Sequence, residues 1–564
     1  MGERGSGENV DRRAFLKGLG AVGSAAVLGG VAAACTSSGS GAEGGTTSAK
    51  QGPTTTSLPA TTTTTVPAVH YDALELPVAT WVVEENARPG TKAWLVSGSP
   101  PHGIEGYADR VSAQPGEEVT LYVNTVARSV EVEAYRIGWY QGYGARFVAN
   151  LGRARGVVQT QPSLTPTVNM IECHWRETLR FAVGQDWPSG YYLLKLLGSN
   201  GYNQWVPLVV RDDSSRAAVL VQSSVTTWQA YNLWGGFSLY GTGPGGYGYP
   251  DRSRVVSFDR PYPANWENGS ADFFGNEYPL VALLERHGVD VTYWTDLDLH
   301  ERSHLLANHR CLVSLGHDEY WSAEMRRGAQ GAVDAGLNFA VLGANCCYRH
   351  IRLQDSPLGT SRRQVCYKDG AEDPLYGVDD AEVTSNWEDG PVPRPESQLI
   401  GVEYQSFGGS GDLVVADAAS FVFSGTGLTD GSRIAGVVGS EFDAYVPQSP
   451  SPANLEILCH AATGSANGPA TVDTGYYTVN GGGGVFASGT ASWINRMWAN
   501  TGILPTPFAP TALPATAAVS RITLNVLAAF SKGPASLTVP SSATWQRFYT
   551  PGSGTLAPVA ATSH

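Results

Sequence analysis

The spacing of apolar positions divides the chain into two structural regions. Between residues 70 and 212, apolar runs are short, alternate with polar positions and are separated by turns, as at 119–123, 130–135, 191–196 and 206–210. Alternation with closely spaced turns is typical of the strands of a β-sandwich. We therefore predict an all-β domain over residues 70–212.

From residue 213 to 535 the strands become nearly continuous apolar runs that alternate with helical patterns. Such runs occur at 217–221, 289–293, 310–315, 338–342 and 485–487. Helices are predicted at 274–287, after Ser322 as N-cap, and at 519–530. Continuous apolar strands separated by helices indicate a parallel sheet covered on both faces. The predicted fold class is an all-β N-terminal domain followed by an α/β domain with a doubly wound, mostly parallel sheet, and residues 536–564 as a loose tail.

The amino-terminal segment has the three parts of an export signal. Arg12 and Arg13 precede Phe-Leu-Lys, a mildly apolar Ala/Gly-rich run covers residues 19–34, and small residues precede Cys35. Paired arginines before a weakly apolar run indicate the twin-arginine route, and a Cys at this position can take lipid. We predict that residues 1–35 are a twin-arginine lipoprotein signal peptide. The alternative is a plain cleavage site beside an incidental Cys.

Residues 36–69 consist mainly of Ser, Thr, Gly and Pro, with almost no large apolar side chains. Such a composition cannot bury enough apolar surface to offset the loss of backbone entropy on folding. We predict a flexible stalk that holds the folded domains off a membrane. With lipid on Cys35, the protein would be anchored to the outer face of the cell membrane.

Charge and cysteine usage narrow the classes of partner. A net charge of −14 without any long basic stretch argues against nucleic acid and against electrostatic binding to anionic lipid. No second apolar stretch reaches membrane-spanning length. The six cysteines besides Cys35 lack Cys-x-x-Cys spacing, so core thiols are expected rather than a zinc site. A single disulfide and a homo-oligomer are both left open.

Residues 136–144 form an unusual segment that is rich in aromatic residues and glycine. One interpretation is a packed corner of the sandwich. The alternative is a protruding loop that faces the carboxyl edge of the neighbouring parallel sheet and helps to close a site there.

Polar and aromatic side chains follow three of the predicted parallel strands. The first strand leads into 227–232, the third into 316–322 and the fourth into 343–345, and a later loop at 394–397 has the same character. Open parallel sheets bind ligands beyond the carboxyl ends of their strands, so we expect these segments to converge on one active site. The ordinary alternatives are core packing for Tyr320 and loop hydrogen bonding for His317 and Asp318.

At these positions the chain resembles the large (beta) subunit of N,N-dimethylformamidase and its relatives, within roughly residues 100–530. The resemblance is carried by Ala230-Tyr231-Asn232, residues 276–287, Thr295-Asp296-Leu297-Asp298-Leu299, Gly316-His317-Asp318-Glu319-Tyr320-Trp321-Ser322 and Arg394-Pro395-Glu396. It implies an α/β domain similar to that of class I glutamine amidotransferases, without their nucleophilic Cys. It also implies one iron ion held by two tyrosines and one glutamate, hydrolysis of a small tertiary formamide to formate and an amine, and a small second subunit.

Transferred residue by residue, the resemblance implies Tyr320 as the first iron ligand. Glu396 is the preferred carboxylate, with Glu403 as the alternative. Tyr278 is preferred narrowly over Tyr231 as the second tyrosine. Ferric iron suits this set because a hard cation favours phenolate and carboxylate oxygens. The ordinary alternatives are a helix-start aromatic for Tyr278 and an ion pair with Arg394 or Arg349 for Glu396.

The remaining candidates would act on water or substrate. His317, Asp318 and Asn345 would orient a metal-bound water or the substrate, and Asn345 could also donate to the developing oxyanion. Tyr231 and Asn232 would contact the substrate. Cys346 beside Cys347 raises the idea of a thiol nucleophile, but no base is identifiable next to them and core packing is expected.

These features favour a metal-dependent hydrolase that acts on a C–N bond of a small amide. Two alternatives come from other classes: a binding lipoprotein that captures a ligand without turnover, and an envelope scaffold without a small-molecule site. Bound iron would favour the hydrolase, whereas a pocket lined by Tyr231, Tyr320 and Asn345 without metal would favour the binding protein.

Cys35→Ala should release the protein from the membrane, because lipid on this residue is its only predicted anchor. Arg12→Lys together with Arg13→Lys should retain the precursor in the cytoplasm. Cell fractionation with and without detergent measures both effects. A Cys35→Ala protein that still partitions with the membrane would contradict the lipid assignment.

Overall fold

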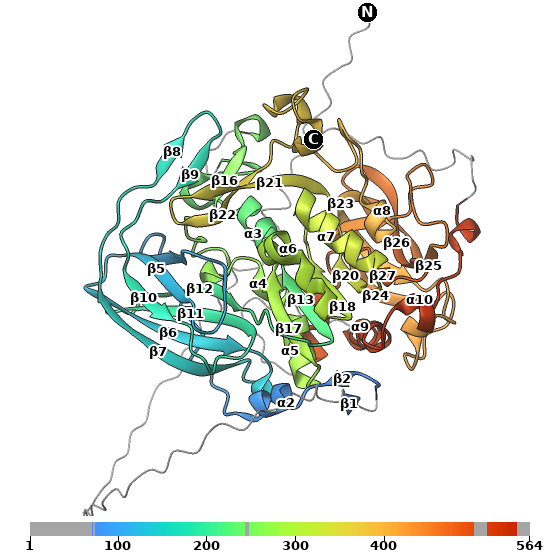
Figure 1. Cartoon of the computed structure of the whole chain (residues 1–564), viewed down its shortest axis with the longest axis horizontal. Coiled ribbons are helices and arrows are strands. Elements are labelled where there is room, and N and C mark those ends of the chain that lie inside the picture. Colours follow the sequence, from blue (N-terminus) through green and yellow to red (C-terminus); the bar gives the residue numbers. More distant parts are fainter. Residues whose placement is uncertain (1–69, 72–73, 243–247, 501–515, 550–564) are drawn as a thin grey trace, which may run out of the picture.

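The computed structural model describes residues 70–71, 74–242, 248–500 and 516–549. Arg12, Arg13, Cys35 and the predicted stalk lie outside these residues. Within them, no helix is long and apolar enough to cross a membrane. Strands predominate and are distributed over several sheets (Figure 1).

Two antiparallel sheets form the predicted β-sandwich. In β6 the burial of side chains alternates from Ser129 to Ala134, so one face of the strand packs inward. The apolar faces of both sheets meet in one core that contains Leu121, Val132, Leu194 and Leu208. The three-stranded sheet has the order β10 (Leu179–Ala182), β5 (Glu118–Thr125), β3 (Ile104–Ala108), and the five-stranded sheet β4 (Ser112–Ala113), β12 (Asn203–Val210), β11 (Gly190–Gly198), β6 (Ser129–Ile137), β7 (Ala145–Arg155).

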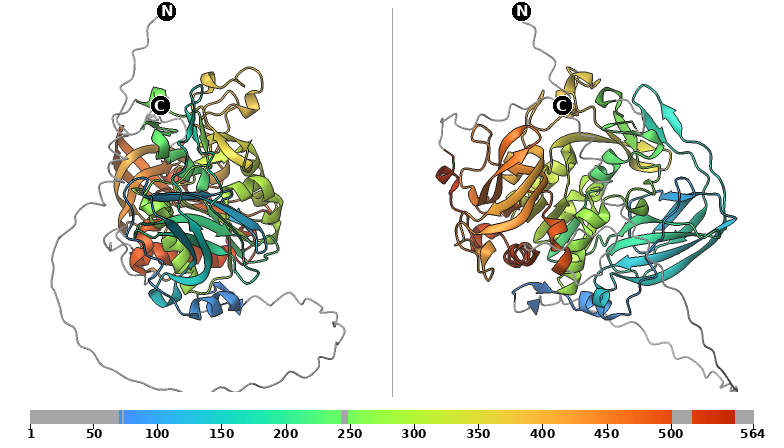
Figure 2. Two further views of the ribbon diagram at one scale, coloured as in Figure 1. Left: turned by 90° about the vertical axis from the view of Figure 1, so that its left-hand side faces the viewer. Right: turned by 180° about the vertical axis from the view of Figure 1, so that it is seen from behind.

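A seven-stranded sheet forms the centre of the α/β region. Its order is β17 (Val291–Thr295), β13 (Val219–Ser223), β18 (Cys311–Gly316), β20 (Asn338–Gly343), β27 (Gly484–Ala487), β26 (Gly468–Thr478), β25 (Glu456–Ser465). The first five strands are parallel, β26 pairs antiparallel with β27, and β25 pairs antiparallel with β26. The mostly parallel sheet predicted from the apolar runs is therefore present. In Figures 1 and 2 its parallel strands lie between the sandwich and the β25–β26 end of the sheet.

Helices cover both faces of this sheet. The main ones are α3 (Val225–Tyr231), α5 (Tyr278–Arg286), α6 (Asp296–Arg302), α7 (Ala323–Asp334) and α9 (Thr516–Phe530). α5 lies on the connection from β13 to β17, and α6 on the return from β17 across β13 to β18. Because these connections run in opposite directions, right-handed crossovers place α5 and α6 on opposite faces.

Local signals account for where these helices begin and end. Ser322 caps α7 as predicted, since its hydroxyl accepts from the Met325 N–H at 3.2 Å. The predicted helix over 274–287 is divided into α4 (Phe273–Asn276) and α5, with a break at Glu277. Pro279 explains the break because it has no N–H to continue the hydrogen-bond ladder.

Several smaller elements were not predicted, and some of them surround the carboxyl edge of the main sheet. They include a four-stranded sheet of β16 (Val255–Ser257), β22 (Gly359–Val365), β21 (Arg349–Ser356) and β19 (Tyr320–Ser322), a long hairpin of β23 (Glu403–Val414) and β24 (Arg433–Ala444), and a short hairpin of β14 (Phe237–Ser238) and β15 (Gly241–Thr242). The remaining elements are β1 (His70–Tyr71), β2 (Pro77–Val78), α2 (Thr80–Ala87), β8 (Ser163–Thr165), β9 (Met170–Glu172), α8 (Ser397–Ile400) and α10 (Ala535–Thr538).

Residues 536–549, predicted as part of a loose tail, pack against the antiparallel end of the main sheet. The Tyr549 hydroxyl donates to Asp473 of β26, and the Trp545 ring lies 5.1 Å from that of Tyr445. The aromatic side chains of this segment supply apolar surface that the prediction overlooked.

All six cysteines in the described part of the chain are buried and free: Cys173, Cys311, Cys346, Cys347, Cys366 and Cys459. They are the core thiols that the sequence predicts, and no disulfide joins any of them.

The sandwich and the α/β region meet at a buried ion pair. Arg136, in β6, donates to Glu285, in the last turn of α5, through hydrogen bonds of 2.6 and 2.9 Å, and both side chains are fully buried. Asn86 of α2 and the Tyr293 hydroxyl of β17 also donate to the Glu285 carboxylate. One carboxylate thus links the sandwich, α2 and the main sheet.

The segment 136–144 packs against the same junction. Tyr140 is fully buried and its hydroxyl donates to Glu85 of α2 at 2.6 Å, while the Trp139 ring lies 5.9 Å from the Arg286 guanidinium at the end of α5. α5 ends just before the chain enters the amino end of β17. The segment is therefore a packed corner, and the alternative of a loop that closes the carboxyl edge of the sheet is wrong.

Glu285→Gln would leave the Arg136 guanidinium buried without its counter-charge. Removing one partner of a buried pair costs about 3–5 kcal/mol, so urea denaturation should show a free energy of unfolding lower by that amount. Glu177→Gln is the matched control: the Arg180–Glu177 pair is 2.7 Å long, but its side chains are 50% and 45% exposed. It should change the free energy by less than about 1 kcal/mol. Equal effects of the two substitutions would contradict a stabilising role for the buried pair.

Glu277 makes the stability dependent on pH. Its carboxyl accepts from the Ser224 N–H and the Ser223 hydroxyl, and burial raises its pKa from 4.5 to about 8 against these hydrogen bonds. The pKa of Glu277 is higher in the folded protein than in the unfolded chain, so the protonated carboxyl stabilises the fold. This contribution is complete below pH 4.5 and is lost as the pH rises through about 8. Glu277→Gln should therefore be less sensitive to pH and, by a few kcal/mol, more stable than the wild type above this range. Urea denaturation on both sides of the window measures the difference, and an unchanged pH dependence would count against it.

Candidate functional site

The candidate site lies beyond the carboxyl ends of three neighbouring parallel strands, where the sequence predicts it. β18 leads into residues 317–320, β13 leads into α3, which ends at Tyr231, and β20 is followed by Asn345. Since β13, β18 and β20 are adjacent in the sheet, their ends lie at one edge. The three segments are thereby brought to one place although more than a hundred residues separate the first from the last.

The Glu319 carboxylate is the centre of the site. The Tyr231 hydroxyl donates to its Oε2 at 2.9 Å, and the Tyr240 hydroxyl lies 2.9 and 2.8 Å from Oε1 and Oε2. The Tyr320 hydroxyl donates to that of Tyr240 at 2.6 Å. We call Glu319, Tyr231, Tyr240 and Tyr320 the Glu319 cluster. Two phenol oxygens thus contact a carboxylate of a residue that is 1% exposed, and a third is linked to it through Tyr240.

Two basic side chains lie against this cluster. Arg349 of β21 is within 3.3 Å of Glu319 Oε1 through its Nε. The Lys368 ammonium lies 3.1 Å from the centre of the Tyr240 ring and 5.4 Å from that of Tyr320. A cation over an aromatic face is attracted to the ring electrons. These cations compensate the negative charge that the site would otherwise bury.

His317 connects Glu319 to a second carboxylate. Its Nε2 lies 3.4 Å from Glu319 Oε2 and 3.2 Å from Glu441 Oε2, on β24. Although burial of the ring opposes the charged form, the carboxylates of Glu441 and Glu319 raise the pKa of His317 to about 9. Its imidazole is therefore protonated at neutral pH, between two carboxylates.

Asn345 holds Glu441 in place. Its side-chain amide donates to Glu441 Oε2 at 2.5 Å, and its backbone N–H donates to Asp443 Oδ1 at 2.8 Å. Burial raises the pKa of Asp443 to about 7. Asn345 has a φ of +56°, a left-handed conformation that Asn tolerates better than most residues. Its buried Oδ1 has no hydrogen-bond partner among the described residues.

Asp318 and Asn232 belong to the supports of the site and not to its centre. Asp318 accepts from the Ser314 hydroxyl at 2.8 Å and the Gln222 amide at 2.9 Å, on the strands below. Asn232 donates to the Pro261 carbonyl at 2.9 Å. Asp318 therefore makes the hydrogen bonds of a loop, which is the ordinary alternative to a catalytic role. The position of Asn232 gives no support to the prediction that it contacts substrate.

Tyr278 is not brought to the Glu319 cluster. Its ring packs among Trp94, Phe273, Phe274 and Trp498, in the aromatic core next to the sandwich. Burial alone raises the pKa of its hydroxyl, with no contribution from a charged neighbour. The geometry therefore favours the runner-up, Tyr231, as the tyrosine that accompanies Tyr320.

Glu396 and Glu403 lie in a second group of carboxyls. Glu396 Oε1 accepts from the Tyr404 N–H at 2.9 Å, and Glu403 accepts from the Ser397 hydroxyl at 2.6 Å. Burial and the neighbouring Glu388 and Glu403 raise the pKa of Glu396 well above its usual range. The Tyr320 hydroxyl donates to Tyr240, which is hydrogen-bonded to Glu319, so the geometry favours Glu319 over Glu396 as the carboxylate of the site.

Three central residues escaped the sequence analysis. Glu319 lies in the motif at residues 316–322, but the predicted catalytic and metal-binding roles there belong to His317, Asp318 and Tyr320. Tyr240 lies at the turn of the β14–β15 hairpin, at the end of an aromatic and Gly-rich segment. Glu441 comes from a strand that no motif marked. Only the position of Glu319 beside Tyr320 offered a signal in the sequence.

The donor atoms of the cluster suit a hard cation. Burial, followed by the Glu319 carboxylate, raises the pKa of the Tyr231 and Tyr320 hydroxyls well above the usual value, so both are phenols unless a strongly charged ion binds. In the described part of the chain, no three His, Cys, Asp or Glu side chains form a metal site of their own. A metal here would depend on tyrosine oxygens, as ferric iron can.

The neighbouring thiols do not provide a nucleophile. Cys346 and Cys347 are buried, and burial raises the pKa of both thiols, so neither is a thiolate at neutral pH. Both cysteines pack in the core, as the sequence predicts.

Comparison with known proteins places the chain in a family. The model of the family described as "N,N-dimethylformamidase beta subunit-like, C-terminal" matches residues 131–502. These residues include the whole Glu319 cluster together with His317, Asn345 and Glu441. No curated protein matches the chain. Because the match covers more than half of the 564 residues, the chain belongs to the N,N-dimethylformamidase beta subunit-like family and carries its C-terminal domain.

Proposed function

We propose that this protein is a metal-dependent hydrolase of a C–N bond in a small amide, with the Glu319 cluster as its reaction centre. The observation that carries the proposal is that two tyrosine hydroxyls bind one buried carboxylate and a third, that of Tyr320, donates to one of them, next to the His317–Glu441 pair. Membership of the dimethylformamidase-like family supports the same reaction class. The mostly parallel sheet, with the candidate site at its carboxyl edge, also supports it.

Glu319, Tyr231 and Tyr240 would hold the metal, for which ferric iron is the proposed identity. They provide two phenol oxygens, each 2.8 or 2.9 Å from an oxygen of the Glu319 carboxylate, and the Tyr320 hydroxyl lies 2.6 Å from that of Tyr240. This set differs from the expected ligands Tyr320, Tyr278 and Glu396 but keeps their chemistry of two tyrosines and one glutamate. Tyr320 lies next to it, through its hydrogen bond to Tyr240. When bound, such an ion polarises the amide carbonyl and lowers the pKa of water.

Glu441 is the proposed proton acceptor. Its Oε2 receives a hydrogen bond from the Asn345 amide and lies 3.2 Å from His317 Nε2, so both neighbours fix the position of this oxygen. It can take a proton from an attacking water and return it to the nitrogen of the leaving amine. His317 balances the charge of Glu441 and Glu319, and Asn345 fixes the direction of the accepting oxygen.

One observation favours a second candidate function. Arg349 and Lys368 already lie against Glu319 and Tyr240, which compensates the cluster without a metal. A protein with this arrangement would bind a small amide by hydrogen bonds and release it unchanged. Export and lipid attachment, as proposed from the N-terminal sequence, suit either function.

Metal analysis distinguishes the two functions. The purified wild type should contain iron and absorb in the visible range, because phenolate bound to ferric iron gives a charge-transfer band. Glu319→Gln and Tyr240→Phe should lose most of the iron and colour, since each removes an anionic oxygen ligand. Tyr278→Phe and Glu396→Gln are the matched controls and should retain both. Iron that is lost from the controls and kept in Glu319→Gln would contradict the proposed ligand set, and a metal-free wild type that binds amides would favour the binding protein.

Activity is then measured as release of amine and carboxylate from a panel of small amides. Glu441→Gln should lower kcat by about 10²–10⁴-fold, the range for loss of a general base, while iron content is unchanged. Full activity of this variant would remove Glu441 from the reaction.

A further inference from the structure

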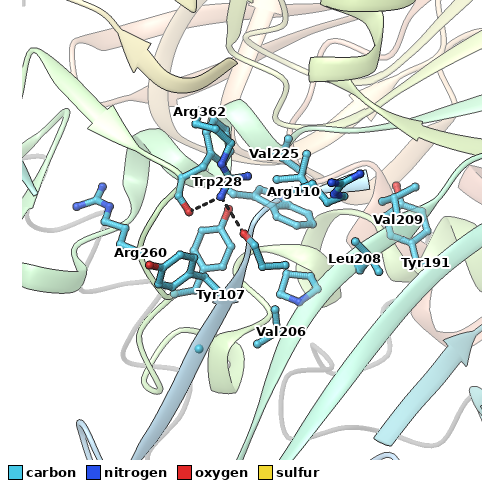
Figure 3. A pocket seen from close by; sticks show the side chains of 16 residues that line it. Tyr107, Arg110, Tyr191, Val206, Leu208, Val209, Val225, Trp228, Arg260 and Arg362 are labelled. Carbon is cyan, nitrogen blue, oxygen red and sulfur yellow. Dashed lines mark hydrogen bonds between the residues drawn. The ribbon is translucent and has the colours of Figure 1, made fainter. Parts of the chain in front are cut away.

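A cavity of about 40 Å³ lies between the sandwich and the α/β region, away from the Glu319 cluster. Its walls come from β3, β12 and α3, together with residues near β16 and β22 (Figure 3). Most of the wall is hydrocarbon, from Val206, Leu208, Val225, Trp228 and Phe258. It is a separate site because none of its lining residues belongs to the cluster.

Four residues in the wall have buried polar atoms without partners in the described part of the chain: Tyr107, Tyr191, Arg260 and Arg362. Among these atoms are the Tyr107 hydroxyl and Nη1 of Arg362, whose side chains are 4% and 3% exposed. Figure 3 shows the Arg362 guanidinium near the Tyr107 ring. Leaving such donors unpaired costs free energy comparable to that of a lost hydrogen bond. The cavity therefore calls for an occupant with a hydrogen-bond acceptor.

The charge around Arg362 indicates that this acceptor is neutral. Its Nε donates to Asp259 at 2.8 Å, and its Nη2 donates to the Ala108 and Phe258 carbonyls at 2.8 and 3.1 Å. Asp259 thus neutralises the guanidinium within the protein. Arg260 also lines the cavity, but its guanidinium donates to the carbonyls of Asn232, Trp234 and Phe237. An anion beside Arg362 would therefore add a buried charge that this guanidinium no longer offsets, which is far more costly than a neutral oxygen.

The size of the cavity limits the ligand. One water needs about 10–15 Å³ by this measure, so a cavity of about 40 Å³ admits about three waters or a molecule of about three or four non-hydrogen atoms. We propose that the cavity is a binding site for a small neutral carbonyl compound, whose oxygen accepts from Tyr107 and Arg362 and whose carbon atoms contact Val206, Leu208 and Trp228.

Binding of acetone and of acetate by the full-length protein, measured by ligand-observed NMR, tests the chemistry. Acetone should bind at least tenfold more tightly than acetate, and crystals soaked in acetone should show it in this cavity. Tighter binding of acetate would make the site an anion site. Binding of neither compound would assign the cavity to water. Both results would overturn the proposal.

Substitutions locate the binding. Tyr107→Phe should weaken acetone binding about three- to tenfold, as expected for the loss of one hydrogen bond. Tyr122→Phe is the matched control, since the Tyr122 ring stacks on Tyr107 at 5.1 Å but does not line the cavity. Val206→Ile, which adds a methylene to the wall, should abolish binding without removing a polar group, and it keeps the test available should Tyr107→Phe fail to fold.

Glu319→Gln separates this site from the proposed reaction centre. It should bind acetone as tightly as the wild type does, whether or not the hydrolase proposal is correct. Binding that is lost in Glu319→Gln but kept in Tyr107→Phe and Val206→Ile would place the carbonyl compound at the Glu319 cluster and overturn the inference.

Discussion

The buried carboxylate of Glu319 is the interaction on which the arrangement of the site depends. An unpaired charge in the interior is very costly, so hydroxyl donors and cations must surround it. Tyr231, Tyr240 and Arg349 supply them from the end of α3, a short hairpin and β21. Elements that are distant in the chain are thus held together by one acceptor. The oxygen atoms that form these hydrogen bonds would also be the ligands of a hard cation.

A second buried carboxylate sets the relation between the two regions of the protein. Glu285 receives hydrogen bonds from Arg136, Asn86 and Tyr293, and so ties the sandwich to α2 and to the main sheet. This contact occupies the end of α5 near the amino edge of the sheet. The carboxyl edge is left to the Glu319 cluster and the small sheets around it. Stability and proposed chemistry are therefore concentrated at opposite ends of the same strands.

Periodicity was enough to predict the regular elements because burial repeats along them. The apolar runs that became β13, β17, β18 and β20, and the Ser322 cap of α7, depend only on neighbouring residues. The location of the site at the strand ends follows from the parallel sheet. The division of roles within the site does not, because it depends on the turn at residues 317–320. There Asp318 faces the strands below while Glu319 faces the tyrosines. Glu441 reaches the site from β24, more than a hundred residues away. Sequence spacing points to Tyr278, but this residue packs in the aromatic core.

The most direct test of the account is a crystal structure of the wild type with anomalous scattering measured on both sides of the iron absorption edge. The account predicts one iron peak within bonding distance of oxygen atoms of Tyr231, Tyr240 and Glu319, next to His317 and Glu441. A peak at Glu396 and Glu403, or a Glu319 cluster without metal in crystals of active enzyme, would contradict it.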